Sequence, residues 1–135
     1  MARITTRHWV VLATACLMTF GNYYCYDIPG GMSVPLQAWL DEPMDNFQWL
    51  FNAFYTAYSI PNAIVPLIAG VLIDRIGTAY IIVIMASFVV SGQTLFALGI
   101  TLRSVPLMML GRVLLGIGGE SLDVVQARVL TDWFK

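Results

Sequence analysis

Four long apolar stretches, separated by short polar segments, dominate the pattern of the chain. They run over about residues 8–32, 47–73, 78–102 and 106–130. Each is long enough to cross a hydrocarbon layer about 30 Å thick, which takes roughly 20 helical residues. A secretory signal peptide would have a shorter apolar core and a small-residue cleavage site. The pattern therefore predicts an all-α protein with four transmembrane helices.

Charges and glycines interrupt this pattern between the second and third apolar stretches. There Gly70 and Gly77 enclose the neighbouring charges of Asp74 and Arg75. A hairpin between two membrane helices would place such a segment at the water boundary, because charged side chains are costly in hydrocarbon. We therefore expect a turn at this point.

Composition supports a polytopic membrane protein and argues against other classes. The chain is 59% hydrophobic and 11% charged, with a mean hydropathy of +0.76, well outside the range of ordinary soluble domains. Its single histidine, His8, and its two cysteines, Cys16 and Cys25, show no metal-ligand or nucleophile spacing. We therefore expect a protein of the lipid bilayer that is no enzyme and needs no metal or cofactor. No basic patch suggests nucleic acid as a partner.

The distribution of charge predicts the orientation of the chain. Basic residues gather at its two ends and in the 70–77 segment: Arg3, Arg7, Arg75, Arg128 and Lys135. The segments between the other stretches hold Asp41, Glu42, Asp45 and Arg103. Basic residues mark the cytoplasmic side of membrane proteins. Both ends of this chain should therefore be cytoplasmic.

The fourth stretch carries the densest set of charges. At about 100° per residue, Arg112, Gly116, Gly119 and Asp123 share a sector of roughly 80°, and Glu120 borders it. This face could pack against neighbouring helices or line a water-filled cavity. Glu120 is about 12 Å along the axis from Arg112, too far for a direct pair, and we favour a cavity role for it. For Arg112 both interpretations stay open.

Polar residues in the first two stretches extend the candidate substrate site. Tyr23, Asp27 and Tyr55 join Glu120 and Asp123 as candidate substrate-binding residues. Asp27 could be half solvated near the outer end, or it could pair with Arg112. The second stretch carries polar residues three or four positions apart along one stripe: Asn52, Tyr55, Thr56, Ser59 and Asn62. The third stretch has few polar residues, which is typical of a peripheral helix.

Three features together resemble the major facilitator superfamily of secondary transporters. They are G-x-L-x-D-R-x-G over residues 70–77, R-x-x-x-G-x-G-G over 112–119, and Ala-Arg over 127–128 followed by Asp-Trp-Phe over 132–134. Thr78 and Ala79 depart from the basic residues that the family has after the second glycine. The resemblance implies a twelve-helix fold in which residues 1–135 form part of the N-terminal transmembrane domain. It also implies gating or structural roles for a set of residues: Gly70, Asp74, Arg75, Gly77, Arg112, Gly116 and Gly119.

Residues 23–29, 36–37 and 114–122 are similar to the lysosomal dipeptide transporter branch of that superfamily. This likeness implies a facilitative carrier of dipeptides that works by alternating access, with Glu120 contacting the substrate amine. It also implies a lysosomal membrane, with the plasma membrane as the alternative, and an accessory membrane subunit. Two alternatives from other classes are a four-helix homodimeric multidrug exporter, with Asp27 as its charge, and a structural four-span protein. As part of a longer carrier, the isolated chain should be inactive.

Overall fold

The structure, a computed structural model, describes residues 5–134, so Arg3 and Lys135 lie outside the described residues. Five helices follow one another in this range: α1 (Thr6–Gly31), α2 (Ser33–Leu40), α3 (Met44–Ile76), α4 (Thr78–Thr101) and α5 (Val105–Trp133). Residues 5–134 contain no strand. The prediction of an all-α protein is confirmed.

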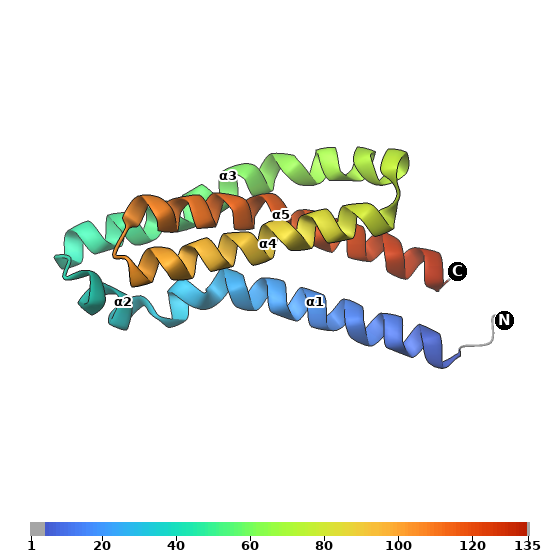
Figure 1. The fold of residues 1–135 in the computed structure, drawn as a ribbon, viewed down its shortest axis with the longest axis horizontal. Helices are drawn as coiled ribbons and strands as arrows, with labels where there is room; N and C mark the ends of the chain where they lie inside the picture. The colour runs from blue at the N-terminus through green and yellow to red at the C-terminus, as the bar shows by residue number, and fades with distance from the viewer. Residues whose placement is uncertain (1–4, 135) are drawn as a thin grey trace.

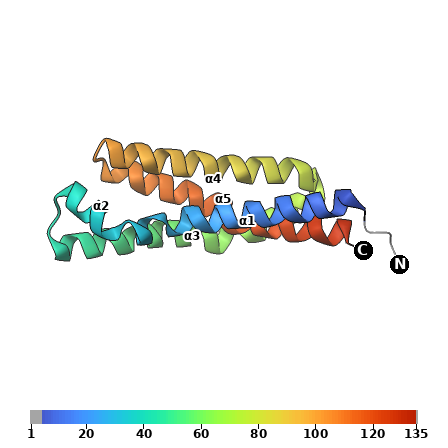
Figure 2. The same cartoon turned by 90° about the horizontal axis from the view of Figure 1, so that it is seen from below.

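The four long helices run side by side along the length of the molecule (Figure 1, Figure 2). Both termini and the turn between α3 and α4 lie at one end, which we call the termini end. The short helix α2 and the turn between α4 and α5 lie at the other, which we call the α2 end. This arrangement brings Arg7, Arg75 and Arg128 toward the same end, although the side of the membrane to which it belongs stays a prediction.

Three helices in the described range are long and apolar enough to cross a membrane, namely α3, α4 and α5. Helix α1 has 26 residues but is not among them. Threonine, asparagine and tyrosine residues interrupt its apolar sequence and lower its hydropathy. Three of the four predicted transmembrane helices are therefore candidate membrane spans by length and composition, and for α1 the span stays a prediction.

The turn predicted at residues 70–77 is tighter than expected. Asp74 and Arg75 belong to the last helical turn of α3, and Gly77 alone separates α3 from α4. Gly77 has φ +97°, a conformation that side chains with a Cβ rarely adopt. The N–H of Gly77 donates to the carbonyl of Ile73 and closes the end of α3. Glycine at this position therefore allows the reversal.

Helices α4 and α5 approach each other closely along glycines from both. A Cβ at Gly92 would lie 2.6 Å from the backbone nitrogen of Leu115, and one at Gly111 would lie 2.6 Å from that of Phe96. Association within a bilayer depends on such close packing, because lipid offers no hydrophobic gain. Helix α5 also packs against α3 and α1. It is thus the helix around which the site residues are arranged.

Candidate functional site: a polar seam between α1, α3 and α5

Polar side chains from three helices meet near the middle of α5, and we call this set the polar seam. Its members come from α1, α3 and α5, and they contact one another directly or through the backbone: Thr19, Asn22, Tyr23, Tyr58, Asn62, Glu120, Asp123 and Gln126. The sequence singled out Asn62, Glu120, Asp123 and Tyr23 as polar members of the helices, the last three among the substrate-binding candidates. The structure brings those three together.

Glycines of α5 create the space for the seam. A Cβ at Gly119 would lie 2.7 Å from the hydroxyl oxygen of Tyr58, and one at Gly116 would collide with the backbone carbonyl of the same tyrosine. Tyr58 is buried between α3 and α5 as a result. Gly116 and Gly119 therefore have a packing role in this part of the molecule.

Two hydrogen bonds join α1 to α5 across the seam. The Asn22 amide donates to the carbonyl of Gly119 at 3.2 Å, and the Thr19 hydroxyl donates to the side-chain oxygen of Gln126. Asn22 is buried, and a buried amide without a partner would be costly. These bonds set the position of α1 beside the acidic residues of α5.

Two carboxylates lie together in the seam. Glu120 and Asp123 are both half-buried and close enough to repel each other. The side chains of Tyr23 and Asn22 interact with Asp123, while the backbone N–H of Glu120 donates to Asn62 Oδ1 at 3.2 Å. Within residues 5–134 the one ion pair joins Arg128 to Asp132, so no basic side chain neutralises either carboxylate there. The pair is chemically suited to receive a cationic group.

Arg112 lies apart from this pair, toward the α2 end, and is almost fully buried with 1% of its surface exposed. Its Nη1 donates to the carbonyl of Tyr26 at 3.1 Å, and the guanidinium lies 4.6 Å from the centre of the Phe96 ring. The carbonyl belongs to the turn of α1 that Pro29 interrupts. Arg112 therefore joins α5 to α1 and α4. This placement agrees with the first of its two interpretations, packing against neighbouring helices.

Asp27 does not pair with Arg112, so that alternative is wrong. Asp27 is exposed, and it lines a separate hollow beside Tyr24 and Gly30. The alternative of a half-solvated Asp27 agrees with this placement. Tyr55 is also outside the acidic pair: its ring packs edge-on against Tyr26 at 5.3 Å and faces Arg112 at 5.9 Å.

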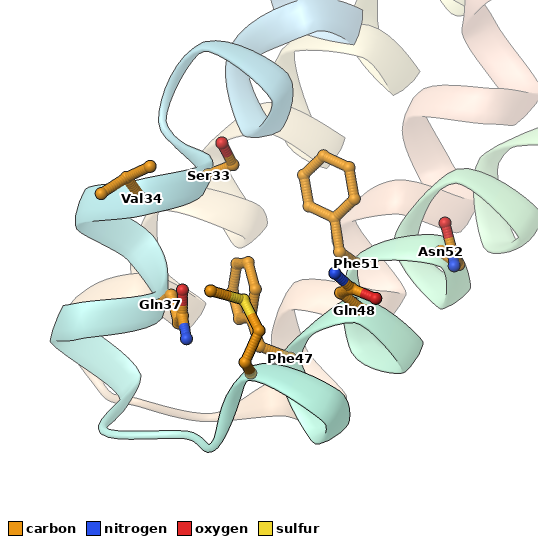
Figure 3. A pocket seen from close by; sticks show the side chains of 8 residues that line it. Ser33, Val34, Gln37, Phe47, Gln48, Phe51 and Asn52 are labelled. Carbon is orange, nitrogen blue, oxygen red and sulfur yellow. The ribbon is translucent and has the colours of Figure 1, made fainter.

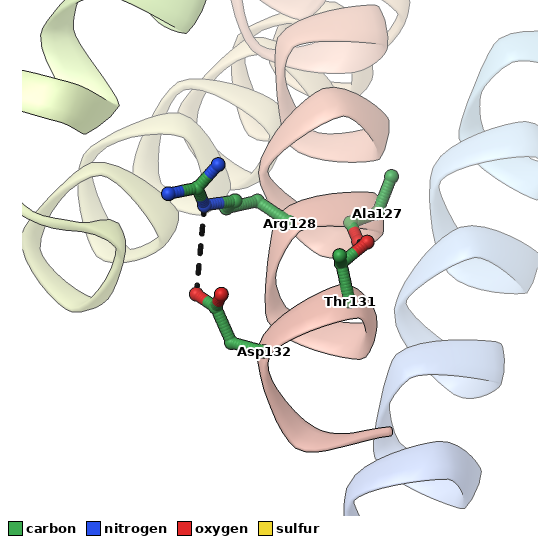
Figure 4. Close-up of polar contacts among 4 residues, drawn as sticks. All are labelled: Ala127, Arg128, Thr131 and Asp132. Carbon is green, nitrogen blue, oxygen red and sulfur yellow. Dashed lines mark hydrogen bonds and ion pairs between the residues drawn. The ribbon is translucent and has the colours of Figure 1, made fainter. Parts of the chain in front are cut away.

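The predicted gating residues of the 70–77 segment lie at the termini end, away from the seam. Asp74 and Arg75 are both exposed on the last turn of α3. At the same end Arg128 Nε lies 3.5 Å from Asp132 Oδ2, one turn further along α5 (Figure 4). Charges thus gather at this end while the seam keeps only carboxylates.

Tyr58 and Thr19 are seam residues that the sequence prediction missed, and Tyr58 is the larger of the two. A tyrosine in a membrane helix is ordinarily assigned to the membrane–water interface. A buried tyrosine is therefore difficult to recognise from the sequence. Its spacing gives the signal that could have found it, since Tyr55, Tyr58 and Asn62 follow one another at three and four positions. Asn22 and Gln126 belong to stretches that the sequence analysis considered. The sequence does not show that Asn22 contacts α5 or that Gln126 contacts α1.

Comparison with known proteins decides the family. The model of the Major Facilitator Superfamily matches residues 7–135. The chain belongs to the major facilitator superfamily. The family assignment and the long apolar helices together identify the chain as an integral membrane protein. The superfamily is a class of transporters rather than of enzymes.

Relatives within the superfamily are similar over nearly the whole chain. Lysosomal dipeptide transporter MFSD1 of Mus musculus is 42% identical over 127 residues, which are 93% of this chain and 26% of the relative. The proteins of the same name from Bos taurus and Homo sapiens are each 39% identical over 127 residues, with the same shares. The chain therefore spans about a quarter of the length of the curated relatives it matches. No solved structure matches it.

Proposed function

We propose that the chain is part of a facilitative carrier that moves small organic solutes, such as dipeptides, by alternating access. The observation that supports this most is the half-buried pair of Glu120 and Asp123, which has no basic partner in residues 5–134. Carboxylates within a membrane helix are costly unless they serve a pathway or a ligand. The similarity to lysosomal dipeptide transporters suggests the amine of a peptide as that ligand.

In this proposal each residue of the seam has a defined task. Glu120 binds the substrate amine, and Asp123 adds to the negative potential with Tyr23 as its hydrogen-bonding neighbour. Asn62 holds the backbone of Glu120 in place. Membership of the superfamily favours a twelve-helix protein in which α1 spans the membrane together with α3, α4 and α5. In such a protein the carboxylate of the peptide binds a cationic side chain on a later helix.

The termini end is cytoplasmic in this proposal, as the basic residues predict. Asp74 and Arg75 then lie at the cytoplasmic gate, and Gly70 and Gly77 belong to the same segment. Arg112, Gly116 and Gly119 keep α1 and α3 seated on α5 while the two halves of the carrier move. We place the carrier in the lysosomal membrane, with the plasma membrane as the alternative, and expect an accessory membrane subunit. The exporter and the structural protein considered from sequence are set aside, because the chain belongs to the superfamily.

Replacing Glu120→Gln in the full gene product tests this proposal. The glutamine keeps the shape of the side chain but loses the charge that binds an amine. Hydrogen bonds to charged groups contribute about 1.5–3 kcal/mol, so dipeptide uptake into proteoliposomes should fall about ten- to a hundredfold. The matched control is Asp45→Asn, which removes an exposed carboxylate at the start of α3. Uptake that is unchanged by Glu120→Gln, in protein that folds normally, would exclude the assignment.

A further inference from the structure

We propose that the hollow between α2 and α3 is a second binding site, for short peptides recognised through their uncharged backbone amides. The choice of peptides rests on the proposed function, whereas the hollow itself does not. It has a volume of about 430 Å³ and is open at the α2 end of the molecule (Figure 3). Eight residues of α2 and α3 line it: Ser33, Val34, Gln37, Met44, Phe47, Gln48, Phe51 and Asn52.

The polar part of the lining consists of uncharged hydrogen-bonding groups. Gln37 of α2 and Gln48 and Asn52 of α3 contribute three carboxamides, and Ser33 contributes a hydroxyl. A carboxamide offers both a donor and an acceptor, which is what a peptide group needs on its two sides. None of the eight lining residues is charged, so the hollow selects for amides rather than for ionised termini.

The apolar part of the lining suits a side chain of the same ligand. Met44, Phe47 and Phe51 line the hollow from α3, and Figure 3 shows the rings of Phe47 and Phe51 near Gln37 and Gln48. Small-molecule sites commonly combine an apolar wall with a few convergent polar groups. This combination favours a peptide with at least one apolar side chain.

Helix α2 is held in place, so the hollow exists before a ligand arrives. Leu36 is 2% exposed and packs in the cluster that contains Phe47 and Phe96. The indole nitrogen of Trp39 donates to the carbonyl of Ile100 at 2.9 Å, and Arg103 lies 4.5 Å from the same indole ring. A preformed wall lowers the entropy lost on binding.

The hollow lies in or near water and is distinct from the polar seam. Helix α3 has 33 residues, about 50 Å at 1.5 Å per residue, whereas hydrocarbon is about 30 Å thick. The helix is therefore longer than the layer, and the acidic Asp45 in its first turn favours that end as a part in water. Gln48 and Asn62 are about 21 Å apart along the helix axis, while an extended dipeptide spans only about 7 Å. One dipeptide cannot reach both sites at once.

Aromatic rings connect the two sites. Phe51 lies 6.0 Å from Phe47 and 5.2 Å from Tyr55 between ring centres. The series continues from Tyr55 to Tyr26 at 5.3 Å and from Tyr26 to Tyr58 at 4.8 Å, where it reaches the seam. The hollow and the seam therefore share one continuous series of aromatic contacts.

A peptide with blocked ends separates the two sites experimentally. The probe is acetyl-leucyl-alanine amide, which has peptide groups but no ionised terminus, titrated by calorimetry against the full gene product in lipid nanodiscs. The double variant Gln48→Leu/Asn52→Leu removes two exposed carboxamides and should weaken binding about tenfold or more. Asn46→Leu is the matched control, because Asn46 is an exposed carboxamide of α3 outside the hollow.

The outcomes distinguish this proposal from the carrier itself. Weaker binding in the double variant, with the Asn46→Leu and Glu120→Gln proteins binding like the unaltered one, supports the hollow even if dipeptide uptake is never observed. Equal binding by the double variant and the unaltered protein overturns it, as does the absence of detectable binding at the solubility limit of the probe. Loss of probe binding in Glu120→Gln would place the probe in the seam and also overturn it.

Discussion

Arg112 carries a full charge in the interior of the bundle, with the carbonyl of Tyr26 as its hydrogen-bond acceptor. Its Nε and Nη2 atoms are buried without a hydrogen-bond partner in the described part of the chain. Flat guanidinium groups tolerate this better than ammonium groups, because they are more weakly hydrated and stack on aromatic rings. Phe96 provides such a ring. The shape of the side chain therefore matters as much as its charge.

This leads to an ordered prediction for two substitutions of Arg112. Arg112→Met keeps much of the volume and removes the buried charge, so it should change the free energy of unfolding by no more than about 1 kcal/mol. Arg112→Lys keeps the charge but loses the stacking surface, and it should destabilise the protein by about 2–3 kcal/mol. Thermal unfolding in nanodiscs measures both. A larger loss of stability in Arg112→Met than in Arg112→Lys would mean that the charge itself stabilises the protein, for example by pairing with an acidic side chain on another helix.

Sequence periodicity located the polar residues at this scale but not their partners. It placed Asp123 and Glu120 on or beside one face of a helix, and the structure agrees. It left Asp27 open as a partner of Arg112, because both were expected in the outer half of their helices. The structure separates them, since Arg112 is turned toward Tyr26 and Phe96 while Asp27 is exposed. The spacing of residues shows which of them share a face of one helix. It does not show how the neighbouring helices are rotated about their own axes.

At the scale of helices, the contact between α4 and α5 is the most extensive in the fold. The atoms that a Cβ would meet at Gly111 are the carbonyl oxygen of Gly92 and the backbone of Phe96. Backbone atoms cannot rotate away as a side chain can. The third apolar stretch was expected to be peripheral, and α4 does expose Val83 and Val90, but its opposite face is closely packed on α5.

Gly111→Ala should therefore destabilise the protein although alanine favours helices. Alanine gains about 0.5–1 kcal/mol from helix propensity, whereas forced separation of two packed helices costs about 1–3 kcal/mol or more. The matched control is Gly70→Ala in α3, where a Cβ would meet nothing within 4 Å. Chemical denaturation in detergent should show lower stability for Gly111→Ala and equal or higher stability for Gly70→Ala. Equal stability of both variants would contradict the packing described here.

Helix boundaries were largely predictable, with two exceptions. The second, third and fourth stretches correspond to α3, α4 and α5 within a few residues, because apolar length decides them. Helix α2 was not predicted, since eight residues after two glycines and before Pro43 resemble a loop. Helix α1 was predicted as a span but has too many polar residues to qualify by hydropathy alone. The polar residues that lower the hydropathy of α1 include Thr19 and Asn22, which also bond α1 to α5 in the seam.

For the whole molecule, the family was recognisable from motifs, whereas the assembly around the seam was not. Charges at 70–77 and glycines at 112–119 belong to one local segment each, and they are visible in a single chain. The proposed substrate pathway needs surfaces on both sides of Glu120, and the chain covers only 26% of the length of the Mus musculus relative. The remaining surfaces of the pathway cannot be deduced from residues 1–135.

Membrane orientation provides the prediction at this scale. If α1 spans the bilayer, Thr5 and Ala79 lie on one side and Asp41 on the other, because Thr5 precedes α1, Ala79 belongs to the first turn of α4, and Asp41 follows α2. Single cysteines at these positions, with Cys16 and Cys25 replaced by alanine, report the side through a membrane-impermeant maleimide. Labelling from the non-cytoplasmic face should occur at Asp41→Cys alone. Equal labelling of Thr5→Cys and Asp41→Cys would show that α1 does not cross.

Gly77 also has a consequence for how the protein is made. A single residue between α3 and α4 leaves no soluble loop that could wait in water while one helix enters the bilayer before the other. If the termini end is cytoplasmic, as the basic residues predict, the two helices are inserted together as a hairpin, with Asp74 and Arg75 remaining on the side of synthesis. A residue that cannot adopt the φ of Gly77 should therefore impair insertion, and the effect would appear as loss of protein from the membrane.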